Sequence, residues 1–200
     1  MTARVAAPVA VETGEPHDQR GRILDSALRL MGEQGAHVTS MRQLAAACGL
    51  NVATLYHYFP SKADLLRSVV EERRYGERLV LDPPPLDLGA PPRRRLVALL
   101  DWLWANALEE EAVWRLLVGE AVRGEAAASH AAREVVDLLA VTLERWLDDG
   151  FPELAGNHAA VALVIRGQVF ALVVEHLALG EVTPAVAHKR AEELASIVVT

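Results

Sequence analysis

A short stretch around residue 55 carries side chains whose types and spacing suit contact with DNA. On one side of a helix, at intervals of three and four, it places Val52, Ala53, Tyr56 and His57. Small apolar groups fit against thymine methyl groups, and a tyrosine hydroxyl or a histidine ring reaches phosphate. Such a face is unusual if it meets only water. The alternative is that Tyr56, His57 and Tyr58 pack against neighbouring helices.

Two short helices joined by a tight turn are predicted to present this face. Ser40 and Gln43 form a capping box that starts the first helix, and Gly49 ends it. Asn51 caps the second helix, which stops before Pro60 because proline disfavours helical geometry in the preceding residue. This pattern is typical of a helix-turn-helix, whose second helix fits the major groove. We call that second helix the recognition helix.

Glycine and proline divide the rest of the chain into helices. Residues 1–17 lack periodicity and are expected to form a disordered arm, and a helical period begins at residue 18. A further helix starts after Ser61, and the prolines between residues 82 and 92 require a loop. Apolar helices are predicted at about 93–108, 111–123, 126–149, 157–179 and 184–198. No segment alternates with period two, so we expect an all-α chain of about nine helices.

Composition narrows the classes of protein. The 200 residues are 52% hydrophobic and 24% charged, as in ordinary globular domains. No apolar run approaches the ~18 residues of a membrane span, so no membrane partner is expected. The single cysteine, Cys48, cannot form an internal disulfide, which favours the cytoplasm.

Charge is distributed unevenly along the chain. Residues 1–78 hold ten lysines and arginines against nine acidic residues, whereas residues 79–200 hold ten against eighteen. No acidic side chain lies between Glu33 and Asp64, while Arg42 and Lys62 fall inside that window. An acid-free window suits a polyanionic partner such as DNA.

Three runs of sequence resemble the TetR family of bacterial transcriptional regulators. They are RILDSALRLM at 22–31, TSMRQLA at 39–45 and GLNVATLYHYFPSKADLL at 49–66. The block TLYHYFPSK is the most specific part, and the resemblance covers about residues 18–72. It implies a three-helix DNA-binding domain with a helix-turn-helix in residues 18–80, which includes the start of a connecting helix. A helical effector-binding and dimerisation domain would occupy residues 81–200.

The resemblance also implies contacts to double-stranded operator DNA. Ser40 would meet phosphate, and Arg42 a base edge or phosphate. The remaining contacts, to bases or phosphates, would come from Val52, Ala53, Thr54, Tyr56, His57, Tyr58 and Lys62. Lys62 resembles the family's phosphate-clamping lysine, and its place at a helix N-terminus favours an anion. Val52 stands where the family often has a polar or basic residue, so hydrogen-bonded readout of bases would rest mainly on Arg42.

A homodimer is the second implication, and one segment supports it independently. The helix predicted at 157–179 is apolar nearly all round, so both of its sides must be covered. A twin helix in a two-fold interface would cover the outer side; the alternative is a central helix of a monomer. The candidate interface residues are Arg166, Gly167, Phe170, Val173 and Val174.

An effector pocket is expected in the second domain, which contains all four tryptophans. Apolar walls with a few orienting polar groups are typical of small-molecule sites, although each tryptophan could equally belong to the core. The candidate lining residues are Trp102, Asn106, Trp114, Trp146, Phe170 and His176. The predicted ligand is a small, mostly apolar molecule.

Other classes of function find little support in the sequence. His130 and Glu134 stand four apart on a helix without a third metal ligand, and the remaining histidines form no catalytic motif. We therefore predict no metal, no cofactor and no enzymatic activity. The chain is expected to be a ligand-responsive repressor that binds a pseudo-palindromic operator as a homodimer and is released by its effector. The alternatives are a helical enzyme or metal-binding protein, or a constitutive DNA binder.

Overall fold

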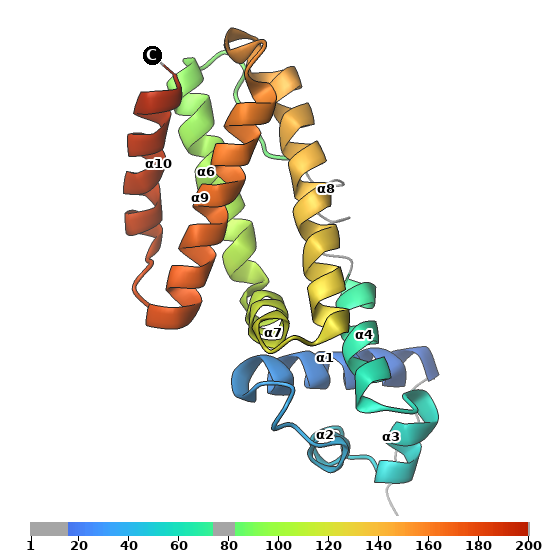
Figure 1. Ribbon diagram of the computed structural model, residues 1–200. Coiled ribbons are helices and arrows are strands. Elements are labelled where there is room, and N and C mark those ends of the chain that lie inside the picture. The colour runs from blue at the N-terminus through green and yellow to red at the C-terminus, as the bar shows by residue number, and fades with distance from the viewer. Residues whose placement is uncertain (1–15, 74–82, 200) are drawn as a thin grey trace, which may run out of the picture.

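The computed structural model describes residues 16–73 and 83–199, and these residues form nine α-helices, one 3-10 turn and no strand. In chain order they are α1 (Pro16–Gln34), α2 (Met41–Ala47), α3 (Val52–Tyr58), α4 (Lys62–Arg73), α6 (Pro92–Glu109), α7 (Glu111–Val122), α8 (Ala126–Gly150), η1 (Pro152–Leu154), α9 (His158–Leu179) and α10 (Pro184–Val198). We call α1–α4 the head. Helices α6, α8, α9 and α10 form an upright bundle, and α7 lies between bundle and head (Figure 1). The predicted all-α fold class is confirmed.

Helix boundaries follow the proline, glycine and capping signals closely. The helix predicted at 126–149, for example, is α8, Ala126–Gly150. One boundary was wrong: α1 begins at Pro16, inside the predicted arm, and residues 1–15 of that arm lie outside the described part of the chain. The proline-rich residues 83–91 form the predicted loop. The predicted domain boundary, at residues 80 and 81, also falls outside the described residues.

The head has its own hydrophobic core. Its most buried side chains come from all four helices and include Ile23, Leu44, Leu55, Phe59 and Leu65, none more than 1% exposed. The guanidinium of Arg20 lies over the Phe59 ring, 4.6 Å from its centroid. These contacts fix the helix-turn-helix against α1 and α4.

Helix α7 is shared between two cores. Val113, Leu116 and Leu117 belong to the core of the head. Trp114, on another face of the same helix, packs into the core of the bundle. The bundle core also contains Leu143, Phe151 and Ile165, each 0% exposed, together with Trp104. The head is therefore completed by a helix that lies more than thirty residues beyond it in the sequence.

Arg95 anchors the proline-rich loop to the end of the bundle. Its side chain is only 6% exposed, and its Nη2 donates to both carboxylate oxygens of Glu153, at 2.6 and 2.7 Å. Its Nη1 donates to the Leu88 carbonyl oxygen, and the guanidinium lies over the Phe151 ring. The Glu153 carboxylate accepts a hydrogen bond from the backbone N–H of Glu153 and others from the Arg95 guanidinium. These interactions hold the pKa of the Glu153 carboxyl below its usual value.

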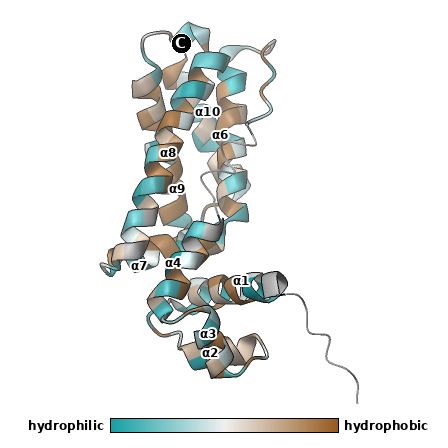
Figure 2. Ribbon diagram, turned by 90° about the vertical axis from the view of Figure 1, so that its right-hand side faces the viewer, coloured by the Kyte–Doolittle hydropathy of each residue, from teal (hydrophilic) through white to brown (hydrophobic). Residues whose placement is uncertain are grey.

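Helix α9 corrects the expectation that no apolar stretch approaches the length of a membrane span. It has 22 residues, its most apolar window of 18 residues has a mean hydropathy of 1.7, and 33% of that window is buried inside the protein. By length and composition it meets the criterion for a spanning helix, which core helices of globular proteins also meet. Hydrophobic segments recur along α8 and α9 (Figure 2), and the exposed apolar side chains of these helices include Val141, Leu163 and Phe170.

Two ion pairs hold α10 against the bundle. Arg190 donates to both carboxylate oxygens of Glu175 on α9, at 2.6 and 2.8 Å. His188 lies 2.8 Å from the Asp101 carboxylate on α6. The hydrogen bond to Asp101, together with its charge and that of Glu192, raises the pKa of the His188 imidazole above its usual value.

The His188 pair should make thermal stability depend on pH. A raised folded-state pKa means that the stabilisation is fully present below the unfolded pKa of about 6.5 and is lost as pH rises through the folded value. Replacing His188 with asparagine should therefore lower Tm at pH 5.5 and have little effect at pH 9. Circular dichroism melts at both values would test this, with Asp101→Asn expected to reproduce the pattern. A Tm difference that is equal at both pH values would contradict it.

Candidate nucleic-acid interface

The first helix of the helix-turn-helix, α2, starts with the predicted capping box. The backbone N–H of Gln43 donates to Ser40 Oγ at 3.2 Å, and the backbone N–H of Ser40 donates to Gln43 Oε1 at 2.8 Å. Each residue thus satisfies a free donor of the other. The start of α2 is set locally, and Ser40 and Arg42 are both left exposed beside it.

The turn between α2 and α3 is fixed by backbone hydrogen bonds. Gly49 adopts φ +66°, a left-handed conformation that favours glycine, and Leu50 N–H donates to the Ala45 carbonyl at 2.8 Å. Asn51 Oδ1 then accepts from Thr54 N–H at 2.7 Å and starts α3. The relative direction of the two helices therefore depends on four residues between them.

The recognition helix α3 turns Leu55 inward and leaves Ala53, Tyr56 and His57 exposed, Tyr56 by 46%. Val52 was expected to point outward, but it is half-buried and packs against the core of the head. Tyr58 is likewise half-buried and packs against this core, as the alternative of packing between helices predicted for this residue.

Thr54 is half-buried, and its hydroxyl donates to Asn51 Oδ1 at 3.0 Å. The face of α3 that is available for contact with DNA is thus narrower than the sequence indicated.

Lys62 stands at the first residue of α4, where Ser61 Oγ accepts from Asp64 N–H at 3.0 Å. Its Nζ donates to the His37 carbonyl oxygen at 3.3 Å. Helices α2 and α3 contain no acidic residue and lie at the end of the head that faces away from the bundle (Figure 1). The arrangement offers hydroxyl, guanidinium, imidazole and ammonium groups at one end of the molecule, on or beside two helices without acidic residues, which suits a phosphate backbone.

The predicted ligand residues separate into different places. Trp114 and His176 line one cavity, and Trp104, which the sequence did not single out, lies with them. The His176 and Trp104 rings meet edge to face at 5.6 Å. The volume of this cavity is about 10 Å³, room for roughly one water molecule.

The other predicted ligand residues lie elsewhere. Trp102 and Trp146 pair edge to face at 5.3 Å, and Trp146 lines a separate cavity beside the proline-rich loop. Asn106 Nδ2 donates to the Trp102 carbonyl of its own helix at 2.9 Å. Phe170 is 50% exposed on the surface of α9. These four residues do not line the Trp114 cavity.

A larger cavity of about 400 Å³, with several charged side chains in its walls, lies between α1 and the junction of α6 and α7. Its walls include Asp25, Arg29 and Glu33 of α1 and Arg115 of α7. Glu111 lines both this cavity and the one at Trp114. The Arg115 guanidinium, with a smaller contribution from His176, holds the pKa of the Glu111 carboxyl below its usual value.

The predicted dimer residues also divide. Val173 is 5% exposed and packs in the bundle core, so little of its side chain faces outward. Arg166 and Val174 are half-buried, and Gly167 is exposed. Two exposed apolar residues of α9 were missed, Leu163 at 59% and Val164 at 47%.

The histidines considered for catalysis lie apart, each beside a different carboxylate. The pairs are His130 with Glu134, His158 with Asp148, His176 with Glu111, and His188 with Asp101. Within residues 16–73 and 83–199, no three His, Cys, Asp or Glu side chains gather closely enough to hold a metal ion.

The sequence analysis did not identify Glu120 as a residue of interest. It is 5% exposed on α7 and accepts a hydrogen bond from the loop between α1 and α2. The signal was present in the sequence: Glu120 follows Val113, Leu116 and Leu117 at helical spacing and so falls on a buried stripe.

Comparisons with known proteins agree with this geometry. The family model for bacterial regulatory proteins of the tetR family matches residues 23–69. The transcriptional repressor KstR of Mycolicibacterium smegmatis is 32% identical over 148 residues, which cover 72% of this chain and 70% of KstR. The regulator BetI of Rhizobium meliloti is 31% identical over 110 residues, and the match spans only about half of BetI, 54% of its length.

Solved structures show the same fold at lower identity. A TetR transcription regulator from Haloarcula marismortui superposes with a TM-score of 0.73 at 19% identity, covering 92% of this chain and 100% of that one. GusR of Salmonella enterica gives 0.69 at 21% identity, covering 95% and 100%. The curated relatives are transcriptional regulators, not enzymes.

Proposed function

Because this chain belongs to the TetR family of bacterial transcriptional regulators, we propose that it is a ligand-responsive repressor of the cytoplasm. It binds a pseudo-palindromic operator in double-stranded DNA as a homodimer and is released by a small, mostly apolar effector. The observation that carries the proposal is the capped helix-turn-helix, whose exposed and acid-free face presents Arg42, Tyr56 and His57. Repression, as the direction of regulation, follows its relative KstR, a transcriptional repressor.

The outer face of α9 supports the homodimer. Leu163, Gly167, Phe170 and Val174 recur every three or four residues and so form one stripe along the helix. Leu163 and Phe170 are at least half exposed, and Val141 on the neighbouring α8 is 69% exposed. Apolar stripes of this kind are covered in oligomers. A two-fold dimer would place two recognition helices about 34 Å apart, one turn of DNA.

The Trp114 cavity supports an effector site. Its walls come from α6, α7 and α9 and are mostly apolar. The indole N–H of Trp104 is buried and has no hydrogen-bond partner within the described residues, so an acceptor group on the effector would satisfy it. The cavity has room for only about one water molecule, so a ligand must move its walls. Because α7 also packs on α1, such a movement would reach the head.

Sequencing genomic DNA fragments bound by the purified protein tests the proposal. The expected result is enrichment of an inverted repeat whose half-sites lie about 10 base pairs, or a multiple of that, apart. Compounds that change tryptophan fluorescence would then be added to operator titrations, and an effector should weaken operator binding. If no inverted repeat is enriched, the proposal of a pseudo-palindromic operator is overturned. Compounds that bind without changing operator affinity would favour a constitutive DNA binder, and turnover of a compound would favour an enzyme.

Lys62 should contribute to operator binding through one phosphate per protomer. Replacing it with alanine should weaken binding to specific and random DNA alike and reduce the slope of log K against log salt by about 1 per protomer. Fluorescence anisotropy at several salt concentrations would measure this. Arg94→Ala is the matched control, because Arg94 is an exposed cation near the start of α6, and α6 starts at the end of the bundle far from the head (Figure 1). An unchanged slope for Lys62→Ala would remove this residue from the interface.

A further inference from the structure

A carboxylate is buried where α7 meets the head. Glu120 is 5% exposed and lies on the α7 face that supplies Val113, Leu116 and Leu117 to the core of the head. Burying a carboxylate is unfavourable unless hydrogen bonds and opposite charges compensate for the lost water. Packing alone would be satisfied by an apolar side chain at this position. The carboxylate therefore has a task that packing does not explain.

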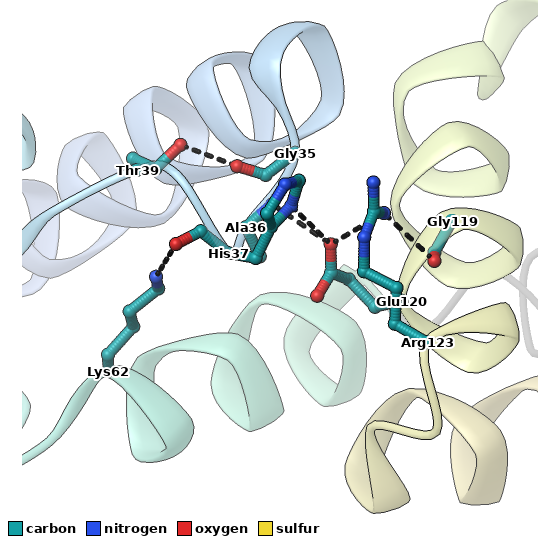
Figure 3. A network of polar contacts seen from close by, with 8 residues as sticks. All are labelled: Gly35, Ala36, His37, Thr39, Lys62, Gly119, Glu120 and Arg123. Atoms are coloured by element: carbon teal, nitrogen blue, oxygen red, sulfur yellow. Dashed lines mark hydrogen bonds and ion pairs between the residues drawn. The ribbon is translucent and has the colours of Figure 1, made fainter.

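The partners of Glu120 come from both sides of the junction. Its Oε1 accepts from the backbone N–H of Ala36 at 3.1 Å and lies 3.8 Å from His37 Nδ1. On the other side Arg123, which follows α7, places Nη1 at 3.4 Å from the same oxygen (Figure 3). Gly35 lets the loop take this path, because its φ is +90° and a Cβ there would lie 2.8 Å from His37 Nδ1.

The loop held by Glu120 includes or contacts two residues proposed to meet phosphate, Ser40 and Lys62. We call residues 35–40, between α1 and α2, the α1–α2 loop. Thr39 Oγ1 donates to the Gly35 carbonyl at 2.8 Å and closes the loop on itself, and the loop ends at Ser40, the N-cap of α2. The His37 carbonyl accepts from Lys62 Nζ, so the same loop also meets the start of α4 (Figure 3).

We infer that Glu120 is a positioning residue that sets the orientation of the head relative to the bundle. The inference rests on the proposed dimeric operator binding. Hydrophobic contacts between α7 and the head have no preferred direction, so they permit small rotations. A hydrogen bond to a backbone N–H is directional and fixes the angle. In a dimer, that angle determines whether both recognition helices can enter the operator at once.

The test compares two DNA probes. One is the operator duplex selected by the wild-type protein, and the other is the same duplex with one half-site scrambled. Glu120→Leu removes both the acceptor and the charge, and it should weaken binding to the full operator by about tenfold or more while changing half-site binding by less than about twofold. Glu120→Gln keeps an acceptor for Ala36 and should fall between wild type and Glu120→Leu.

Glu193→Gln is the control for loss of charge alone, because Glu193 is exposed on α10, away from the apolar stripe of α9. It should behave as wild type. Hydrogen exchange at the Ala36 amide should be faster in Glu120→Leu than in the control. If Glu120→Leu does not fold, Glu120→Gln and the exchange rate of Ala36 carry the test alone.

The outcomes separate this inference from the proposed function. Equal losses on both probes would assign Glu120 to overall stability, and an unchanged preference for the full operator would exclude a positioning role; either result overturns the inference. A wild-type protein that binds both probes equally well would instead overturn dimeric operator binding. A selective loss on the full operator, graded from glutamine to leucine, supports the positioning role.

Discussion

Replacing Phe170 with glutamate is expected to convert the proposed dimer into a monomer and to remove most of the protein's affinity for a two-half-site operator. Phe170 lies in the middle of the apolar stripe of α9 and is 50% exposed. A charge there would be buried against its own copy across a two-fold axis, which is strongly unfavourable. Without a second head held nearby, operator affinity should fall by about 100-fold or more.

Light scattering during gel filtration would measure the mass, and operator titration the affinity. Ile197→Glu is the matched control, because Ile197 is 75% exposed on α10, away from α8 and α9. A Phe170→Glu variant that keeps the mass of a dimer would contradict the α9 interface. If Ile197→Glu alone became monomeric, the interface would lie on α10.

Replacing Phe59 with alanine should destabilise the protein by about 3 to 5 kcal/mol, a large part of the roughly 5 to 15 kcal/mol typical of a folded domain. Phe59 is 1% exposed at the end of the recognition helix, and the substitution would leave a cavity beneath α3 and remove the cation–π contact with Arg20. Urea denaturation followed by circular dichroism would give the free energy of unfolding. Phe59→Leu should cost less than about 1.5 kcal/mol, because more of the volume is kept. A loss below 1 kcal/mol for alanine, on the order of a surface change, would contradict this role.

Local signals explain why so much of the fold was predictable. The start of α2 depends on Ser40 and Gln43, and that of α3 on Asn51, all within three residues of the bonds they form. Gly49 and Pro60 act over similar distances. Helices bounded by such residues need no tertiary information to be located.

The direction of α9 could not be predicted because its apolar residues surround the helix. Such a pattern has no polar face that would mark the outer side of the helix. The sequence therefore cannot distinguish Val173, which is buried, from Leu163, which is exposed. The tryptophans were ambiguous for a different reason. Trp102 pairs with Trp146, and Trp104 with His176, across 44 and 72 positions of chain, and only the packing of α6 against α8 and α9 decides those partners.

The double membership of α7 limits how this regulator can be recombined with its relatives. A graft that joins its first 80 residues to another bundle would leave behind Val113, Leu116 and Leu117, which close the core of the head, and would also lose Glu120. The transplanted head would then expose the apolar surface that α7 covers, and the backbone N–H of Ala36 would lack its hydrogen-bond acceptor. Exchange of DNA specificity between such proteins therefore requires that α7 be transferred together with the head. Otherwise, the α7 residues of the recipient that face the head must be mutated to match the transplanted head.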